Sequence, residues 1–447
     1  AKLRDAGFGA GRWPENQSAA YQRQDNINRE YMPTFRDQPQ HHTFDLGLEF
    51  IERNASEDRW YLQIETFDPH EPFFTHEEFQ RLYPHEYDGP PFDWPAYREV
   101  REDEQTVQHL RYMYASLVSF CDYQLGRVLD AFDRLDLWKD TMLIVNTDHG
   151  FMLGEHDWWG KLVMPFFQEV AHIPFWIYDP RHPEAGGRRV EALSTTVDIP
   201  PTVLDFFGIR VPETTQGRSL EDRLASPAAA PARPCVIYGM FGGHVNVTDG
   251  RLVYMRGPAS SENGLLHEYT LVPTHTSSLF HPRELQQWER HDGFGFTKGC
   301  KLMKVPARQP IKSDGSPVGK GRLATMLFDV VADPGMTAPL SDAAAEARMI
   351  ELLVSAMAAS DAPPEQYARL GLPAPDRATP DAIRRACVCG TERGRRFAEQ
   401  GVEGSPLMPF HRTVWPGGPE INFPHNLRLR PGYLFSGNGE LPVLSKL

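Results

Sequence analysis

Thr141-Met142-Leu143-Ile144-Val145-Asn146-Thr147 is the stretch that decides the fold, and Asp148-His149-Gly150 follows it directly. The four consecutive apolar residues predict a short strand buried on both faces, as in a parallel sheet covered by helices. A second run of this kind, Ile173-Pro174-Phe175-Trp176-Ile177-Tyr178, lies downstream. Helix-like segments precede and follow these runs, and this alternation of strands and helices predicts an α/β domain.

The helices around these strands are predicted from the spacing of apolar residues. Residues 106–135 carry apolar side chains at every third or fourth position, which predicts a long amphipathic helix. The same reading predicts shorter helices over 44–51 and 199–207 and a further strand over 58–67.

The composition changes at residues 223–234, an Ala- and Pro-rich stretch that is typical of a linker. Beyond it, the turn signal Asp249-Gly250 and a later helix over 343–357 predict a smaller antiparallel sheet with one helix packed on it. Its strands are expected at 236–239, 245–247, 251–255 and 326–330. We therefore expect the large α/β domain over 1–230, the small antiparallel-sheet subdomain over 231–372, and a Pro/Gly-rich C-terminal extension over 373–447.

Composition excludes several classes of protein. The 447 residues include 46 Lys and Arg against 60 Asp and Glu, a formal charge of −14, which argues against nucleic acid as a partner. No run approaches the roughly 18 apolar residues of a membrane span. Five scattered cysteines are too few for a disulfide scaffold. No compartment is predicted, and an oligomer stays open.

The chemistry is expected immediately after the first strand, because ligands of open α/β sheets bind at the carboxyl ends of strands. The carboxylate of Asp148 and the imidazole of His149 can bind a divalent cation there. Gly150 lets the backbone turn away without a side-chain clash. His156 and Lys161 follow on the same loop, and beside a metal they would form a pocket for a multiply charged oxyanion.

Two further histidines are candidates. His70 lies in Phe67-Asp68-Pro69-His70-Glu71-Pro72-Phe73, where an imidazole held between two prolines suits proton transfer to a leaving oxygen. His244 follows Gly242-Gly243, where the small subdomain would close over the cleft, and is a candidate substrate contact. Each candidate alone also fits an ordinary loop or surface residue. Their joint occurrence at predicted strand ends favours a site.

The order of these motifs resembles the sulfatases of the alkaline phosphatase superfamily. The resemblance extends over residues 40–372 and rests on Asp68–Phe73, Leu125-Gly126-Arg127, Thr147–Gly150, Leu153-Gly154-Glu155-His156, Trp159-Gly160-Lys161, Val197–Thr202 and Gln216–Leu220. It implies an alkaline-phosphatase-like sandwich, with a central, mostly parallel sheet flanked by helices and a smaller C-terminal antiparallel sheet.

The resemblance also implies a function, the metal-dependent hydrolysis of sulfate monoesters of a small molecule or a glycan. Asp148 and His149 would bind one divalent cation, calcium first, with Mn, Mg or Zn as alternatives. Lys161 would bind the sulfate oxygens, and His70 would contact the sulfate and assist the leaving alcohol. His156 would line the site or support a ligand.

The sequence departs from the family at the nucleophile. In the family this is a Cys or Ser in a Cys-x-Pro-x-Arg motif that becomes formylglycine, and neither this motif nor the family's Asp-Asp metal pair occurs here. We expect both in an N-terminal segment outside this chain. Two alternatives stay open: a phosphonate monoester or phosphodiester hydrolase of the same superfamily, and a non-catalytic homologue that binds a sulfated ligand.

Overall fold

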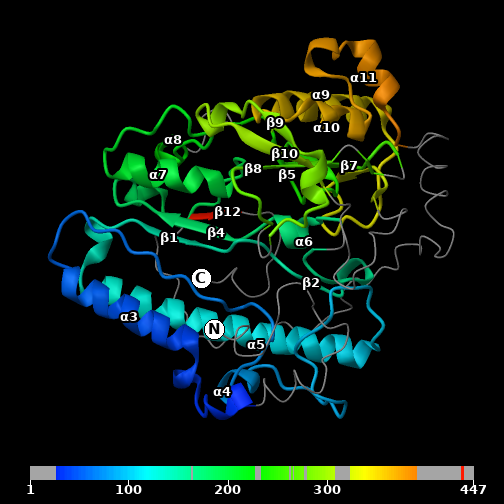
Figure 1. Ribbon diagram of the computed structural model, residues 1–447. Helices are drawn as coiled ribbons and strands as arrows, with labels where there is room; N and C mark the ends of the chain where they lie inside the picture. The colour runs from blue at the N-terminus through cyan, green and yellow to red at the C-terminus, as the bar shows by residue number, and fades with distance from the viewer. Residues whose placement is uncertain are drawn as a thin grey trace.

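The structure is a computed structural model that describes residues 27–162, 165–226, 233–260, 263–264, 266–275, 279–307, 323–389 and 434–436. Within these residues, helices and sheets alternate along the chain as the sequence predicts, so the α/β class is confirmed. Two sheets, each covered by helices, form the body in Figure 1. The expectations for residues 1–26 and for most of the C-terminal extension lie outside the described residues.

The first sheet has the order β1-β4-β12, with β1 at Leu143–Asn146, β4 at Phe175–Tyr178 and β12 at Leu434–Ser436. Both predicted apolar runs are therefore strands. Their direction differs from the prediction, because β1 and β12 both pair antiparallel with β4, and the expected mostly parallel pairing is not observed among the described strands. An apolar run records burial on two faces, and it carries no information on the direction of the neighbouring strand.

Helices lie on both faces of this sheet (Figure 1). Leu143 packs into a cluster with α3 and α5, whereas the next residue, Ile144, packs against a cluster that includes Leu224 of α8. Successive side chains of a strand point to opposite faces, so the apolar run of β1 is explained by cover on both sides. The helices concerned are α3 (Pro39–Asn54), α5 (Glu104–Arg134), α7 (Ile199–Phe206) and α8 (Glu221–Ala225).

Residues 58–67 were expected to form a strand, and this prediction is wrong for the described structure, which assigns no strand there. The side chains do alternate between partly buried and exposed: Leu62 and Ile64 pack under α3 and α5, whereas Tyr61 and Phe67 are exposed. A period of two in the sequence records this alternate burial, but a strand also requires a hydrogen-bonded neighbour, which the pattern does not encode.

The second sheet has the order β11-β7-β6-β5 and is antiparallel throughout. Tyr254 and Leu327 pack against α9 (Ala343–Ala359), whereas Val253 and Met255 pack with Met152 of the loop that follows β1. The predicted strands, turn and helix are confirmed. Through Val253 and Met255 the second sheet also packs against Met152, which follows Asp148 and His149 closely in the chain. The strands are β5 (Val236–Gly239), β6 (Val245–Thr248), β7 (Leu252–Arg256) and β11 (Met326–Asp329).

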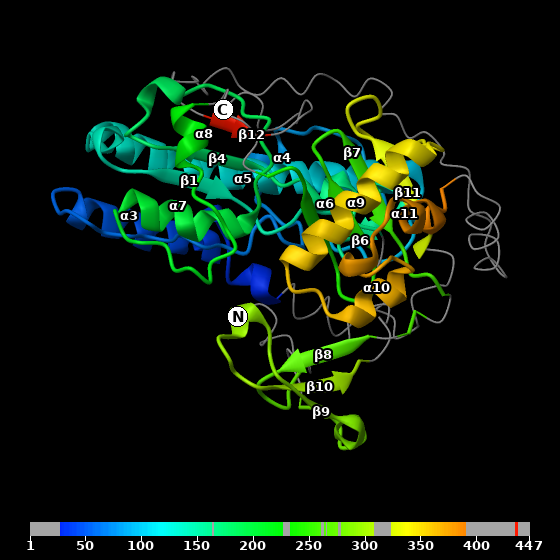
Figure 2. The same cartoon turned by 90° about the horizontal axis from the view of Figure 1, so that it is seen from above.

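A third sheet, β8-β10-β9, projects from the body in Figure 2 and was not expected from the sequence. Among the helices that the structure describes, none combines the length and apolar character that a membrane-spanning segment requires. The remaining elements are α4 (Glu77–Gln80), β2 (Met152–Leu153), β3 (Trp159–Gly160), α6 (Gln168–Ala171), β8 (His267–Thr270), β9 (Glu289–His291), β10 (Leu302–Pro306), α10 (Pro364–Leu370) and α11 (Pro380–Ala386).

Candidate functional site

The turn after β1 carries the first two candidate residues. The N–H of Gly150 donates to the carbonyl of Val170 at 2.9 Å, which brings the turn against α6. A Cβ atom at Gly150 would lie 1.8 Å from the carbonyl oxygen of Glu169, so only glycine fits this approach. The tight turn leaves Asp148 and His149 side by side at the end of β1, with Asp148 largely exposed.

Asp148 and His149 together present an oxygen and a nitrogen. Oδ2 of Asp148 lies 3.3 Å from Nε2 of His149. Nδ1 of His149 lies 3.0 Å from the carbonyl oxygen of Gly150, and because a carbonyl only accepts, Nδ1 carries the proton. Nε2 therefore keeps the lone pair that a metal needs. Within the described ranges no group of three or more metal-binding side chains is found, so this pair offers two ligands by itself.

His70 lies in the loop after the extended segment 58–67. Its Nδ1 is 2.7 Å from the carbonyl oxygen of Glu71 and must donate to it, which leaves Nε2 available for proton exchange. Burial lowers the pKa of His70; the neighbouring Glu71 opposes this, and the charges of Lys161 and His149 lower the pKa further. The ring is therefore held in one tautomer and within electrostatic range of the turn after β1.

Lys161 follows β3, the second strand of a small hairpin. Gly160 adopts φ +106°, and a Cβ there would meet the ring of Tyr97 at 2.7 Å, so a glycine is needed to bring the lysine inward. Lys161 is only 7% exposed. Burial lowers its pKa, while Glu71 and Asp148 raise it. The structure thus brings Lys161 and His70 to the same Glu71 carboxylate, and each lies within electrostatic range of one residue of the Asp148-His149 turn.

Sequence reasoning missed two residues at the centre of this group, Glu71 and Tyr97. The Glu71 side chain is fully buried, with Oε2 3.6 Å from Nζ of Lys161 and 3.4 Å from Nδ1 of His70. The Tyr97 hydroxyl donates to Oε1 of Glu71. Burial and this carboxylate raise the pKa of Tyr97, which keeps the hydroxyl protonated as a donor. An acidic residue between the prolines that flank His70 was the available signal for Glu71.

The structure places the other two predicted histidines in packed surroundings. The ring of His156 stacks on Phe167 with centroids 3.7 Å apart, and its Nε2 lies 3.5 Å from Oε1 of Glu169. His244 lies directly before β6 of the second sheet, where it is buried and donates from Nε2 to the carbonyl of Ala324 at 2.8 Å. Burial lowers the pKa of His244 to about 4, so it is neutral near pH 7.

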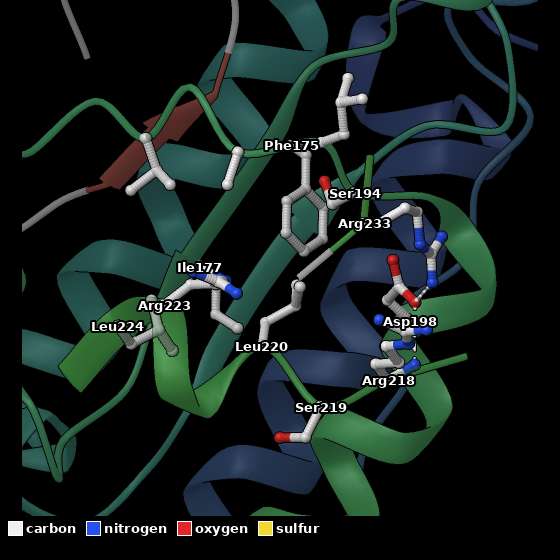
Figure 3. A pocket seen from close by; sticks show the side chains of 13 residues that line it. Phe175, Ile177, Ser194, Asp198, Arg218, Ser219, Leu220, Arg223, Leu224 and Arg233 are labelled. Atoms are coloured by element: carbon white, nitrogen blue, oxygen red, sulfur yellow. Dashed lines mark hydrogen bonds and ion pairs between the residues drawn. The ribbon is translucent and has the colours of Figure 1, made fainter. Parts of the chain in front are cut away.

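A separate cavity lies beside β4, and Figure 3 shows its lining. Phe175 and Ile177 give it an apolar wall, and at its edge Arg233 pairs with Asp198 at 2.7 Å. None of the six site residues predicted from the sequence lines this cavity. The cavity is therefore distinct from the group around Lys161.

Comparison with known proteins gives one consistent family. The family model described as Sulfatase matches residues 3–209, a range that holds His70, the Asp148-His149 turn and Lys161 but ends before His244. An arylsulfatase of Clostridium perfringens is 27% identical over 240 residues, covering 43% of this chain and 49% of that protein. The multifunctional alkaline phosphatase superfamily protein PehA of Trinickia caryophylli is 35% identical over 123 residues, covering 28% and 24%.

The chain covers less than half the length of both of these relatives. Among solved structures, the phosphonate monoester hydrolase of Agrobacterium radiobacter superposes with a TM-score of 0.47 at 19% identity, covering 73% of this chain and 61% of that one.

Proposed function

Because this chain belongs to the sulfatase family of the alkaline phosphatase superfamily, we propose that the protein is a metal-dependent hydrolase of sulfate monoesters. The observation that carries this proposal is that His70 and Lys161 share the Glu71 carboxylate and lie within electrostatic range of His149 and Asp148 at the end of β1. A buried ammonium, a single-tautomer imidazole and a carboxylate–imidazole pair are together what a tetrahedral oxyanion and a cation require. The substrate class is a sulfate ester of a small molecule or a glycan.

Asp148 and His149 would hold one divalent cation. The donors fit, because the Gly150 carbonyl fixes the His149 proton on Nδ1 and leaves Nε2 free beside the Asp148 carboxylate. We propose calcium first, as the family resemblance implies, with Mn, Mg and Zn as alternatives; of these, Zn best suits the imidazole nitrogen, and Mn and Mg best suit the carboxylate. When bound, such a cation supplies positive charge to the non-bridging oxygens of the ester.

The chain's own residues would supply the remaining chemistry. The ammonium of Lys161 would bind a non-bridging sulfate oxygen, and its burial strengthens that interaction because water screens it less. His70 would donate a proton from Nε2 to the leaving oxygen. Burial lowers the pKa of His70 in the free protein. We expect the bound anion to raise this pKa again, so that His70 becomes protonated when the substrate binds. We assign no nucleophile among the residues of this chain.

The test is the turnover of 4-nitrophenyl sulfate by the full-length protein. Lys161→Ala should lower kcat/KM by on the order of 10²- to 10³-fold, and His70→Ala by on the order of 10²-fold or more. Asp148→Ala should abolish the metal dependence of turnover. Lys139→Ala and His42→Ala, on exposed surface, are matched controls and should change nothing. Unchanged turnover in Asp148→Ala would refute the site.

A second candidate is a phosphonate monoester or phosphodiester hydrolase. The 35% identity to PehA over 123 residues supports it, since that protein is described as multifunctional within the superfamily. Sulfuryl and phosphoryl transfer need similar stabilisation of charge on oxygen. Relative kcat/KM for 4-nitrophenyl sulfate, bis(4-nitrophenyl) phosphate and 4-nitrophenyl phenylphosphonate separates the two. Binding of a sulfate ester without any turnover would instead indicate a non-catalytic binding protein.

A further inference from the structure

The Glu71 carboxylate is buried at the centre of a group that is proposed to bind an anion. Its side chain has no exposed area. A buried carboxylate is costly unless its oxygens are paired, and a carboxylate next to an anion site also repels the ligand. Glu71 carries both the free-energy cost of burial and the repulsion of the ligand, so its position has to be explained by a role in the site.

The two oxygens of Glu71 have different surroundings. Oε1 accepts the hydroxyl of Tyr97. Oε2 accepts no hydrogen bond from any described residue, yet it lies 3.4 Å from Nδ1 of His70 and 3.6 Å from Nζ of Lys161. Neither of these nitrogens therefore makes a tight hydrogen bond with Oε2. Both belong to the two side chains that would contact the substrate.

In this arrangement Glu71 offsets the positive charge of Lys161. Lys161 contributes one positive charge, and Glu71, buried against it, subtracts one at nearly the same place. Whatever cation Asp148 and His149 bind, Glu71 lowers the net charge seen by the ligand by one. The repulsion from that charge is twice as large for a dianion as for a monoanion, because Coulomb energy is proportional to the ligand's charge.

We infer that Glu71 is a specificity-determining residue that selects singly charged tetrahedral esters over doubly charged ones. Sulfate monoesters, phosphonate monoesters and phosphodiesters carry one negative charge near pH 8, whereas phosphate monoesters carry two, since their second pKa is about 6. The inference rests on the proposed function only in taking His70 and Lys161 as the anion-binding groups. It predicts a discrimination by charge that the motif residues alone do not explain.

The test compares two probes of equal shape, methyl sulfate and methyl phosphate, by titration calorimetry with the purified protein at pH 8 and low salt. Glu71→Gln keeps an acceptor for Tyr97 and removes the charge. We expect it to raise the ratio of methyl phosphate affinity to methyl sulfate affinity on the order of tenfold, the effect of one partly screened charge on one further ligand charge. Glu71→Asp, which keeps the charge, should keep the ratio within about twofold of wild type.

Tyr97→Phe is the matched control, because it breaks the same local network without changing its charge. A ratio that moves in Tyr97→Phe as far as in Glu71→Gln would mean that only packing matters, and the inference would fail. It would also fail if Glu71→Gln left the ratio unchanged, or if wild type bound methyl phosphate at pH 8 as tightly as methyl sulfate.

A second readout uses wild type alone, in case Glu71→Gln does not fold. Between pH 5 and pH 8 methyl phosphate changes from a monoanion to a dianion while methyl sulfate stays a monoanion. Relative to methyl sulfate, methyl phosphate should bind on the order of tenfold more weakly at pH 8 than at pH 5; a constant ratio would overturn the inference. A protein that hydrolyses no sulfate ester but shows both charge effects would refute the proposed function and leave the role of Glu71 intact.

Discussion

Two buried carboxylates, Glu71 in the loop after the extended segment and Glu346 in α9, have equally inaccessible side chains and each lies near one cationic side chain, but their hydrogen bonds differ. At Glu346 the carboxylate accepts the Tyr254 hydroxyl at 2.8 Å and the backbone N–H groups of Val388 and Cys389 at 3.0 Å. At Glu71 one oxygen accepts no hydrogen bond from a described residue. A fully hydrogen-bonded carboxylate stabilises packing, whereas an incompletely bonded one beside cationic groups is a mark of a site.

The largest expected effect is on stability at the second sheet. Glu346→Gln should lower the free energy of unfolding by about 3 kcal/mol, because the amide loses the charge that faces Arg256 and replaces one of the two oxygens that accept from Tyr254, Val388 and Cys389. Urea unfolding measures this effect. A loss under about 1 kcal/mol would contradict the structural role given to Glu346.

A third carboxyl, Asp122 on α5, extends the comparison to pH. Burial raises its pKa to about 6, and its Oδ1 accepts no hydrogen bond from a described residue. A carboxyl whose pKa is higher in the folded state favours folding most below the unfolded value of 3.8, and this contribution is lost as pH rises through about 6. Asp122→Asn should therefore stabilise the protein at pH 8 by up to about 3 kcal/mol and leave it nearly unchanged at pH 4.

Thermal unfolding of wild type and Asp122→Asn from pH 4 to pH 8 provides the measurement. The exposed Asp58→Asn is a suitable control, since its side chain is 91% exposed and should show no such dependence. Parallel stability curves for Asp122→Asn and wild type would mean that the carboxyl does not titrate in this range.

A smaller effect on stability is expected at Glu71. Glu71→Gln should change the free energy of unfolding by at most about 1 kcal/mol, because the amide keeps an acceptor for Tyr97 and removes the cost of burying a charge. The same Glu→Gln substitution would thus distinguish the two carboxylates: the free energy of unfolding would fall strongly at Glu346 and hardly change at Glu71. Equal losses in urea unfolding would erase the distinction between them.

The sequence predicted most of the elements for physical reasons, whereas the site remains a prediction. Apolar spacing is a local signal, and it located α5, β1, β4, the second sheet and α9 correctly. Strand direction and pairing are long-range properties, so the parallel pairing and the strand over 58–67 were predicted wrongly. Motif order brought His70, Lys161 and the Asp148-His149 turn into one hypothesis, and the structure places them within electrostatic range.

What the sequence could not give is the environment of single side chains. His244 follows two glycines in the sequence, and only the structure shows it buried and bonded to a backbone carbonyl. Glu71 reads as an ordinary acidic residue, because burial and the approach of Tyr97 from a distant loop are invisible in the chain. These are tertiary properties, and they decide which polar residues serve packing and which serve a site.

The smallest expected effect compares the histidines of the two regions. Both His70 and His244 have a pKa lowered chiefly by burial, His244 to about 4. A histidine with a lowered folded pKa contributes stability above its unfolded value of 6.5, and that contribution is lost as pH falls. Methyl sulfate should raise the pKa of His70 by about one unit in an NMR titration and leave His244 unchanged, since only His70 would lie beside the anion. If methyl sulfate changed neither pKa, His70 would be a buried loop histidine like His244. The surroundings of the two histidines would then differ only in their packing.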